Sequence, residues 1–151
     1  MAEVQKLFIA VAQHAPMREV EEVLAIADKG LENCVHGRRG SRRQVLLMEG
    51  ETLDELHLEP GTVRENVTTR GIRLGDLSAG HRLRIGEALL EVALPCEPCE
   101  RMDEIRVGLQ HALQGRRGVL CRVMESGFMR RGDGISILGP AVVVHEKGGE
   151  S

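Results

Sequence analysis

The chain has 151 residues, of which 42% are hydrophobic and 28% charged, and these proportions predict one soluble domain with one core. A formal net charge of -3 argues against a nucleic-acid partner or an anionic membrane surface. With two Phe, no Trp and no Tyr, the chain also lacks the aromatic side chains on which single-stranded nucleic acid stacks. The core must therefore consist of aliphatic side chains and methionine.

The sequence shows no signal for a membrane or for secretion. It contains no run of about 18 apolar residues, so we expect no transmembrane helix and no membrane partner. Its first residues, MAEVQKLFIAVAQ, lack the features of a signal peptide, and we expect a cytoplasmic protein. In a reducing compartment cysteines are more often free thiols, metal ligands or redox-active groups than disulfides. The four that this expectation covers are Cys34, Cys96, Cys99 and Cys121.

Patterning in the first half of the chain predicts short elements separated by polar segments. Residues 4–12 are rich in strand formers and predict a strand. Residues 17–28 fit either a helix with one apolar face or a buried strand. Residues 62–74 alternate in polarity, which is typical of strands, with a break at Gly71. Between these come a polar loop over 31–43, a buried strand over 44–48 and a brief helix over 50–58.

The second half predicts a hairpin, a helix and a last pair of strands. Residues 81–86 and 87–95 are expected to form the hairpin. The spacing of apolar residues over 103–115 predicts the helix. Residues 118–138 predict two strands paired like a hairpin, and the polar tail 145–151 is expected to fray.

These elements predict a mostly β (α+β) fold, a barrel-like or sandwich-like domain with one or two short helices. The sequence shows no repeat, low-complexity segment or linker. We therefore expect a single domain over 1–151, with its core at about 4–138.

The sharpest local feature is Cys96-Glu97-Pro98-Cys99, directly after an apolar strand. Two thiols three residues apart can chelate a metal or form a redox pair, and loops at strand ends often carry sites. The alternative is that both cysteines are half-buried and pack as small hydrophobic residues. Cys121 lies inside an apolar strand and is expected to belong to the core.

A second candidate site combines Cys34 and His36, which stand two residues apart in the polar loop. Together with Cys96 and Cys99 they form a Cys3His set of the kind that binds zinc. The chain would then be a metal-binding interaction module without catalysis. The alternative is a surface histidine beside a buried cysteine.

The same loop carries a basic cluster of four arginines interspersed with glycines: Arg38, Arg39, Arg42 and Arg43. Guanidinium groups bind phosphate in a fork, and backbone N–H groups at glycines add donors for anions. The cluster predicts either a site for a phosphate-bearing small molecule or a solvated, charged loop.

A further polar set stands on the predicted strand over 62–74. In an extended chain Arg64, Asn66 and Thr68 point to one face. Such a face either meets solvent, as is usual in an antiparallel sheet, or lines a pocket. No phosphate-loop, dinucleotide or nucleophilic-serine motif accompanies these residues.

An ordered set of segments runs through the chain: GLENCVHGR, RRQVLLM, RENVTTRGI, GHRLRIGEALLEV, PCEPC and RVMESGFMRRGDGISI. Together they resemble the MOSC family, named for the C-terminal domain of molybdenum cofactor sulfurase, over roughly residues 4–138. The resemblance implies a stand-alone MOSC-type β-barrel-like domain, and molybdopterin as its cofactor.

The resemblance also implies roles for residues. The family's marked cysteine follows a proline after the LEV strand, and here that position is Cys99. In reductase members this cysteine ligates molybdenum, and the sulfurase branch is associated with sulfur delivery. Cys99 and Cys96 would then be the catalytic thiols of a sulfur transferase or molybdenum-dependent reductase, served by a redox or sulfur-donor protein. The cofactor would be held by His36, Arg38, Arg43, Arg64, Asn66 and Thr68.

Two departures from the family pattern add thiols around Cys99. The family loop often reads G-D-x-H, and Cys34 stands near the Asp position. Many members have Arg ahead of the P-C pair, near the place where Cys96 stands. Both changes favour soft-metal or persulfide chemistry, with zinc as the alternative metal.

Overall fold

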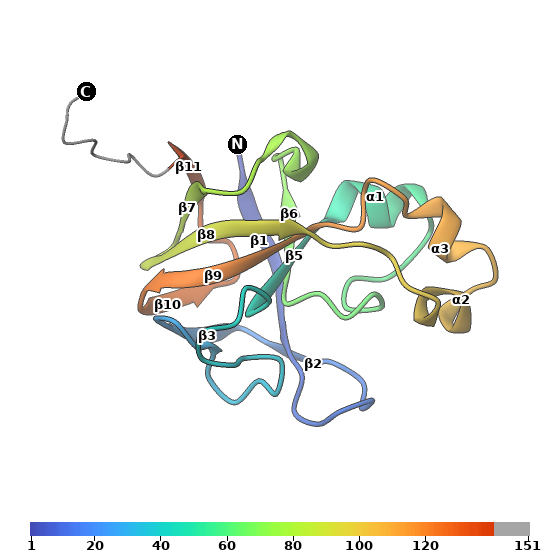
Figure 1. Ribbon diagram of the computed structural model, residues 1–151, viewed down its shortest axis with the longest axis horizontal. Helices are drawn as coiled ribbons and strands as arrows, with labels where there is room; N and C mark the ends of the chain where they lie inside the picture. Colours follow the sequence, from blue (N-terminus) through green and yellow to red (C-terminus); the bar gives the residue numbers. More distant parts are fainter. Residues whose placement is uncertain (141–151) are drawn as a thin grey trace.

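Two β-sheets form the framework of the computed structural model, which describes residues 1–140 (Figure 1). The larger sheet has eight strands in the order β11-β7-β8-β9-β5-β6-β1-β2, and the smaller has three in the order β10-β3-β4. In chain order the strands are β1 (Glu3–Ile9), β2 (Arg18–Val20), β3 (Glu22–Ile26), β4 (Gly30–Leu31), β5 (Val45–Glu49), β6 (Val67–Arg70), β7 (His81–Ile85), β8 (Ala88–Pro95), β9 (Val119–Glu125), β10 (Gly127–Arg130) and β11 (Ile135–Pro140). The expectation of a mostly β fold is confirmed.

The larger sheet curls until the start of β1 meets the turn that leads into β11. Val4 N donates to Asp133 O at 2.8 Å, and Ile135 N donates to Ala2 O at 3.0 Å. These bonds pair the part of β1 that β2 leaves uncovered, because β2 lies only against Leu7–Ile9. Pairing an edge in this way satisfies backbone groups that an open sheet would expose. The result is the barrel-like curl that the sequence predicts.

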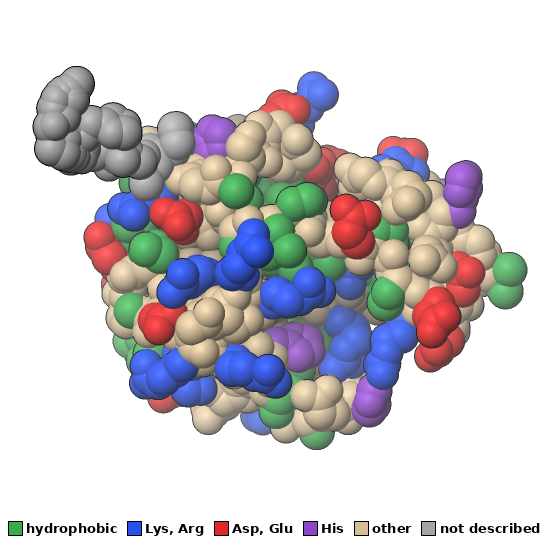
Figure 2. Space-filling view, viewed as in Figure 1, with side chains coloured by type: hydrophobic (Ala, Val, Ile, Leu, Met, Phe, Trp, Pro, Cys, Tyr) green, Lys and Arg blue, Asp and Glu red, His purple; other side chains and the backbone are tan. Residues whose placement is uncertain are grey.

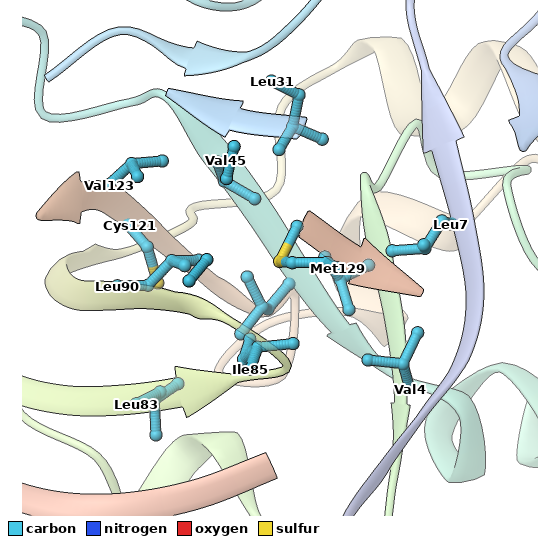
Figure 3. Close-up of a cluster of buried hydrophobic side chains, with 14 of the residues drawn as sticks. Val4, Leu7, Leu31, Val45, Leu83, Ile85, Leu90, Cys121, Val123 and Met129 are labelled. Carbon is cyan, nitrogen blue, oxygen red and sulfur yellow. The ribbon is translucent and has the colours of Figure 1, made fainter. Parts of the chain in front are cut away.

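Aliphatic side chains from both sheets fill the inside of the curl. Leu7, Val45, Leu90 and Met129 are fully buried and point into one cluster (Figure 3). Met129 lies on β10, so this cluster joins the smaller sheet to the larger one. Burial of each such side chain contributes about 1.5–3 kcal/mol, which lets a chain nearly without aromatic residues build a core.

A lobe of short helices stands beside the sheet (Figure 1). It packs around a second apolar cluster that includes Leu53, Met102 and Leu109 and is anchored by Met48 of β5. Among residues 1–140 no helix is long and apolar enough to span a membrane. The helices of the described chain are α1 (Gly50–Glu55), α2 (Arg101–Ile105), α3 (Leu109–Ala112) and the 3-10 helix η1 (Leu74–Asp76).

The single helix expected over 103–115 is wrong, because the chain forms α2 and α3 with a break between them. Gly108 has φ +89°, in the left-handed region that glycine occupies without strain. Arg106 is extended, with φ -157° and ψ 129°, and its guanidinium donates to Leu56 O and His57 O. The break thus provides donors for carbonyl groups at the end of α1, which the helix itself leaves unpaired.

Three expectations about strands can be compared with the structure. Residues 17–28 form β2 and β3, so the strand alternative is correct. Residues 118–138 do not form a hairpin, because β9 pairs with β5 and β8, β10 with β3, and β11 with β7. Over 62–74 the strand is limited to β6, and two turns closed by hydrogen bonds from Thr62 N to Glu59 O and from Arg64 N to Gly61 O come before it. The predicted frayed tail at 145–151 lies outside the described residues.

Candidate functional site

A cavity of about 970 Å³ opens between the curled sheet and the helical lobe. On this face Figure 2 shows basic side chains gathered around a hollow. Pockets for small molecules typically measure about 300–1,000 Å³, so the cavity has the size of a ligand site. Its walls come mainly from residues 13–17, 35–43, 60–66, 96–105 and 117–120.

Cys96 and Cys99 both line this cavity, with different exposure. β8 ends at Pro95, and Cys96 N donates to Gly118 O at 2.9 Å, which holds the loop against the start of β9. Cys99 O accepts from Met102 N at 2.9 Å and so joins the first turn of α2. Cys96 is half-buried and Cys99 is exposed. Another molecule therefore reaches Cys99 first, while Cys96 belongs to the wall.

The electrostatic surroundings of Cys96 keep its thiol protonated. Burial raises the pKa of Cys96, while the guanidinium groups of Arg117 and Arg43 act in the opposite direction. Cys99 and Glu97 add to the increase in the pKa. Because the thiolate is the nucleophilic form of cysteine, Cys96 is a poor nucleophile at neutral pH as long as the cavity holds no ligand.

Cys34 is not among the cavity-lining residues and is buried in the core. Its Sγ accepts from Ala10 N at 3.3 Å and lies 3.5 Å from Nδ2 of Asn66. His36, two residues later, does line the cavity. Within residues 1–140 no three His, Cys, Asp or Glu side chains are grouped to hold a metal ion. The predicted set of three cysteines and one histidine is therefore not assembled as a zinc site.

Three of the predicted arginines, Arg38, Arg43 and Arg64, line the cavity. Arg64 has φ +66° and sits in a turn in which its N–H donates to Gly61 O at 3.0 Å. Non-glycine residues seldom adopt this conformation, and those that do are often found at functional sites. From this turn the guanidinium donates to Ala15 O, in the loop before β2. Arg64 thereby connects two walls of the cavity.

His36 shares the cavity with Arg64, and its pKa depends on that neighbour. Burial, and then the charge of Arg64, lower the pKa of His36 below its ordinary value, so the imidazole is neutral at pH 7. Replacing Arg64 with glutamine is expected to raise the pKa of His36 but to leave it low, because burial is the larger cause. An NMR titration of the ring protons measures the change. Arg42→Gln, outside the cavity lining, is the control, and equal titrations of all three proteins would contradict the expected coupling.

The other two predicted pocket residues, Asn66 and Thr68, are occupied by the protein itself. Asn66 lines the cavity, but its Oδ1 accepts from Leu46 N at 2.9 Å and its Nδ2 donates to Phe8 O at 3.1 Å. Thr68 is fully buried outside the lining and donates to Oε2 of Glu65 at 2.7 Å. Arg64, Asn66 and Thr68 do not share one face of a strand, as was predicted, because β6 begins only after Asn66. Both residues hold the wall in place.

Among the cavity residues that were not predicted from the sequence, three have basic side chains: His14, Arg101 and Arg117. Nη1 of Arg101 lies 2.8 Å from Nδ1 of His14, so α2 contacts the loop before β2 at the cavity. Arg117 is buried in the segment that leads into β9, and its Nη2 donates to Val63 O at 2.6 Å. These residues stand far apart in the sequence and share no motif. The one available signal for Arg117 was its position as a charged residue two places before the apolar strand β9.

Comparison with known proteins identifies the family and the fold. A family model described as the MOSC domain matches residues 35–136. YuaD from Bacillus subtilis has a TM-score of 0.74 and 19% identity, and the match covers 89% of this chain and 93% of that chain. YiiM from Geobacillus stearothermophilus has a TM-score of 0.75 and 17% identity, with 91% and 75% covered. YiiM from Escherichia coli has a TM-score of 0.69 and 21% identity, with 95% and 72% covered. No curated protein matches the chain.

Proposed function

The chain belongs to the MOSC domain family, and on that premise we propose that its cavity binds a molybdenum cofactor of the molybdopterin type, with Cys99 as the reactive thiol. MOSC domains are generally linked to molybdenum cofactor binding or sulfur transfer. The proposal depends above all on one observation, that two thiols and a set of arginines line the same cavity.

The side chains of the cavity fit such a cofactor chemically. Arg38, Arg43 and Arg64 provide guanidinium groups, which bind phosphate through paired hydrogen bonds. Cys96 and Cys99 provide sulfur, the soft type of donor that suits thiophilic metals and sulfur carriers. One cavity thus offers a place for a phosphate group and a place for metal or sulfur chemistry.

The residues of the chain have distinct parts in this proposal. The bound cofactor supplies a molybdenum centre for oxygen-atom or sulfur transfer. The arginines hold its phosphate, and neutral His36 offers a hydrogen bond without adding charge. Cys99 is exposed to a sulfur-donor protein, whose persulfide it attacks as a thiolate. The S–S bond of the donor persulfide breaks as a new S–S bond forms between its outer sulfur and Cys99 Sγ, and the donor leaves as a thiolate.

The test is an analysis of the freshly purified full chain, wild type beside Cys99→Ser, from a host that makes the cofactor. We expect molybdenum and an oxidised fluorescent pterin in the wild type, and about tenfold less molybdenum in Cys99→Ser, because an exposed thiol ligand is lost. Sulfane sulfur, measured as thiocyanate after cyanolysis, is expected on the wild type and absent from the variant.

Cys121→Ala is the matched control, because it removes a thiol that lies in the core and outside the cavity lining. It should retain the molybdenum, pterin and sulfane sulfur of the wild type. A wild-type protein that contains none of the three would overturn the proposal, as would one that contains zinc and no pterin.

A further inference from the structure

Arg117 is the most enclosed charged side chain of the cavity. Its exposed fraction is 7%, whereas Arg38 and Arg43 are exposed. It stands between α3 and β9, and its Nη2 donates to Val63 O at 2.6 Å. The guanidinium is therefore held in place by the turn that precedes β6.

Arg117 forms no ion pair with the carboxylates of residues 1–140. Its Nη1 is buried and has no hydrogen-bond partner among residues 1–140. None of the ion pairs formed within these residues includes Arg117. Glu65, two residues after Val63 in the chain, is also buried; its Oε2 accepts from Gly61 N at 2.8 Å and from Thr68 Oγ1 at 2.7 Å, and its Oε1 has no hydrogen-bond partner among residues 1–140. It forms no ion pair with Arg117. A buried guanidinium without an anion is strongly unfavourable, so the site is incomplete as it stands.

The neighbouring acidic groups do not supply the missing anion. Cys96 lies close enough for the charge of Arg117 to act on it, yet burial raises the pKa of Cys96 and keeps the thiol protonated. Glu104 also lines the cavity, but it is exposed to solvent and forms no ion pair within residues 1–140. A ligand that brings an anionic group to this wall of the cavity would supply the counter-ion.

We infer that Arg117 binds an oxyanion group of the ligand at the inner wall of the cavity, beside Cys96. The oxyanion is of the phosphate class. This inference rests on the proposed function, because the ligand enters the same cavity. It adds that one residue, Arg117, binds the innermost anionic group of that ligand. Nη1 is the free donor of a guanidinium whose Nη2 is already fixed by Val63 O. Arg43, whose charge also reaches Cys96, adds to the attraction.

The location beside Cys96 gives a test on the unmodified full chain, with inorganic phosphate as the probe. The four cysteines are alkylated with iodoacetamide and followed separately by mass spectrometry. Phosphate is expected to slow alkylation of Cys96 about fivefold or more, by covering its sulfur, and that of exposed Cys99 less than about twofold. Sodium chloride at equal ionic strength should protect neither. Equal rates at Cys96 with and without phosphate would overturn the inference.

Substitutions then separate binding from folding. Calorimetry is expected to show phosphate affinity about tenfold weaker in Arg117→Met, because a charged donor is lost. Arg117→Lys keeps the charge without the fork and should lie between Arg117→Met and the wild type. Arg42→Gln, an exposed arginine that donates to Ala93 O and does not line the cavity, should bind as the wild type does. Equal affinity in wild type and Arg117→Lys would contradict the inference, even if Arg117→Met does not fold.

The outcome is distinguishable from that of the proposed function. If the purified chain carries pterin, Cys96 should be protected without added phosphate, and that protection should be weaker in Arg117→Lys. If the chain carries pterin but Cys96 is not protected, the result would contradict the role of Arg117 and still support the bound cofactor. If phosphate protects Cys96 in a chain that never carries pterin, the result would support oxyanion binding at Arg117 and contradict molybdopterin as the ligand.

Discussion

Replacing Asn66 with alanine is expected to lower the free energy of unfolding by about 3 kcal/mol, because it leaves two buried backbone groups without partners. These groups are Leu46 N–H and Phe8 C=O, which the Asn66 amide joins at 2.9 and 3.1 Å. The same amide lies 3.5 Å from the Sγ of buried Cys34. A side chain only 1% exposed offers water little access to replace these bonds. Urea denaturation of both proteins measures the loss.

Gln114→Ala is a suitable control for this prediction. Gln114 is exposed and carries a side chain of similar chemistry near the end of the helical lobe. Its replacement should change the stability by no more than about 0.5 kcal/mol. If Asn66→Ala were as stable as Gln114→Ala, the amide would not be what holds β1 and β5 to the turn at the cavity.

Raising the pH from 8 to 11 is expected to cost the protein about 2–3 kcal/mol of stability through a single buried thiol, Cys121. Burial raises the pKa of Cys121 from an ordinary value of 9.0 to about 12. Below pH 9 both the folded and the unfolded chain keep this proton, and the stability is unaffected. Above pH 9 the unfolded chain releases the proton while the folded chain retains it. Each further pH unit then favours unfolding by about 1.4 kcal/mol until the folded thiol also titrates.

Denaturant unfolding at several pH values measures this slope, and a substitution assigns it. Cys121→Ala should be less stable at every pH because it leaves a small cavity in the core, but its stability should fall less steeply above pH 9. Cys99→Ser removes an exposed thiol and should keep the slope of the wild type. The same slope in Cys121→Ala and wild type would show that other groups cause the alkaline loss.

Local patterns predicted the parts of this protein that depend on neighbours in sequence. The hairpin of β7 and β8 forms because its strands are adjacent and joined by a tight turn at Gly86, which has φ +58°. Cys121 lies in the core because it shares a face of β9 with buried Val119 and Val123, on a strand that pairs with both β8 and β5. The thiol loop was expected at the end of a strand, and it follows β8 directly.

Long-range contacts overturned several local expectations. The strands after Gly118 resemble a hairpin in sequence, yet β10 leaves β9 to complete the smaller sheet against β3. The predicted helix breaks at Gly108, where Arg106 turns back to the carbonyl groups beyond α1. In both cases partners distant in the chain offered more burial or better hydrogen bonds than the local pattern.

The sequence by itself determined the β-rich class, the family and the residue types of the site, since strand patterning and ordered motifs are properties of short segments. Only the tertiary structure decided which of those residues meet. It brought Cys96, Cys99 and three predicted arginines to one cavity, and left Cys34 and Thr68 out of its lining. It also placed Arg117 on the wall. The physical reason is that the cavity wall is built from segments that lie more than a hundred residues apart in the chain, and their meeting depends on how the sheet curls.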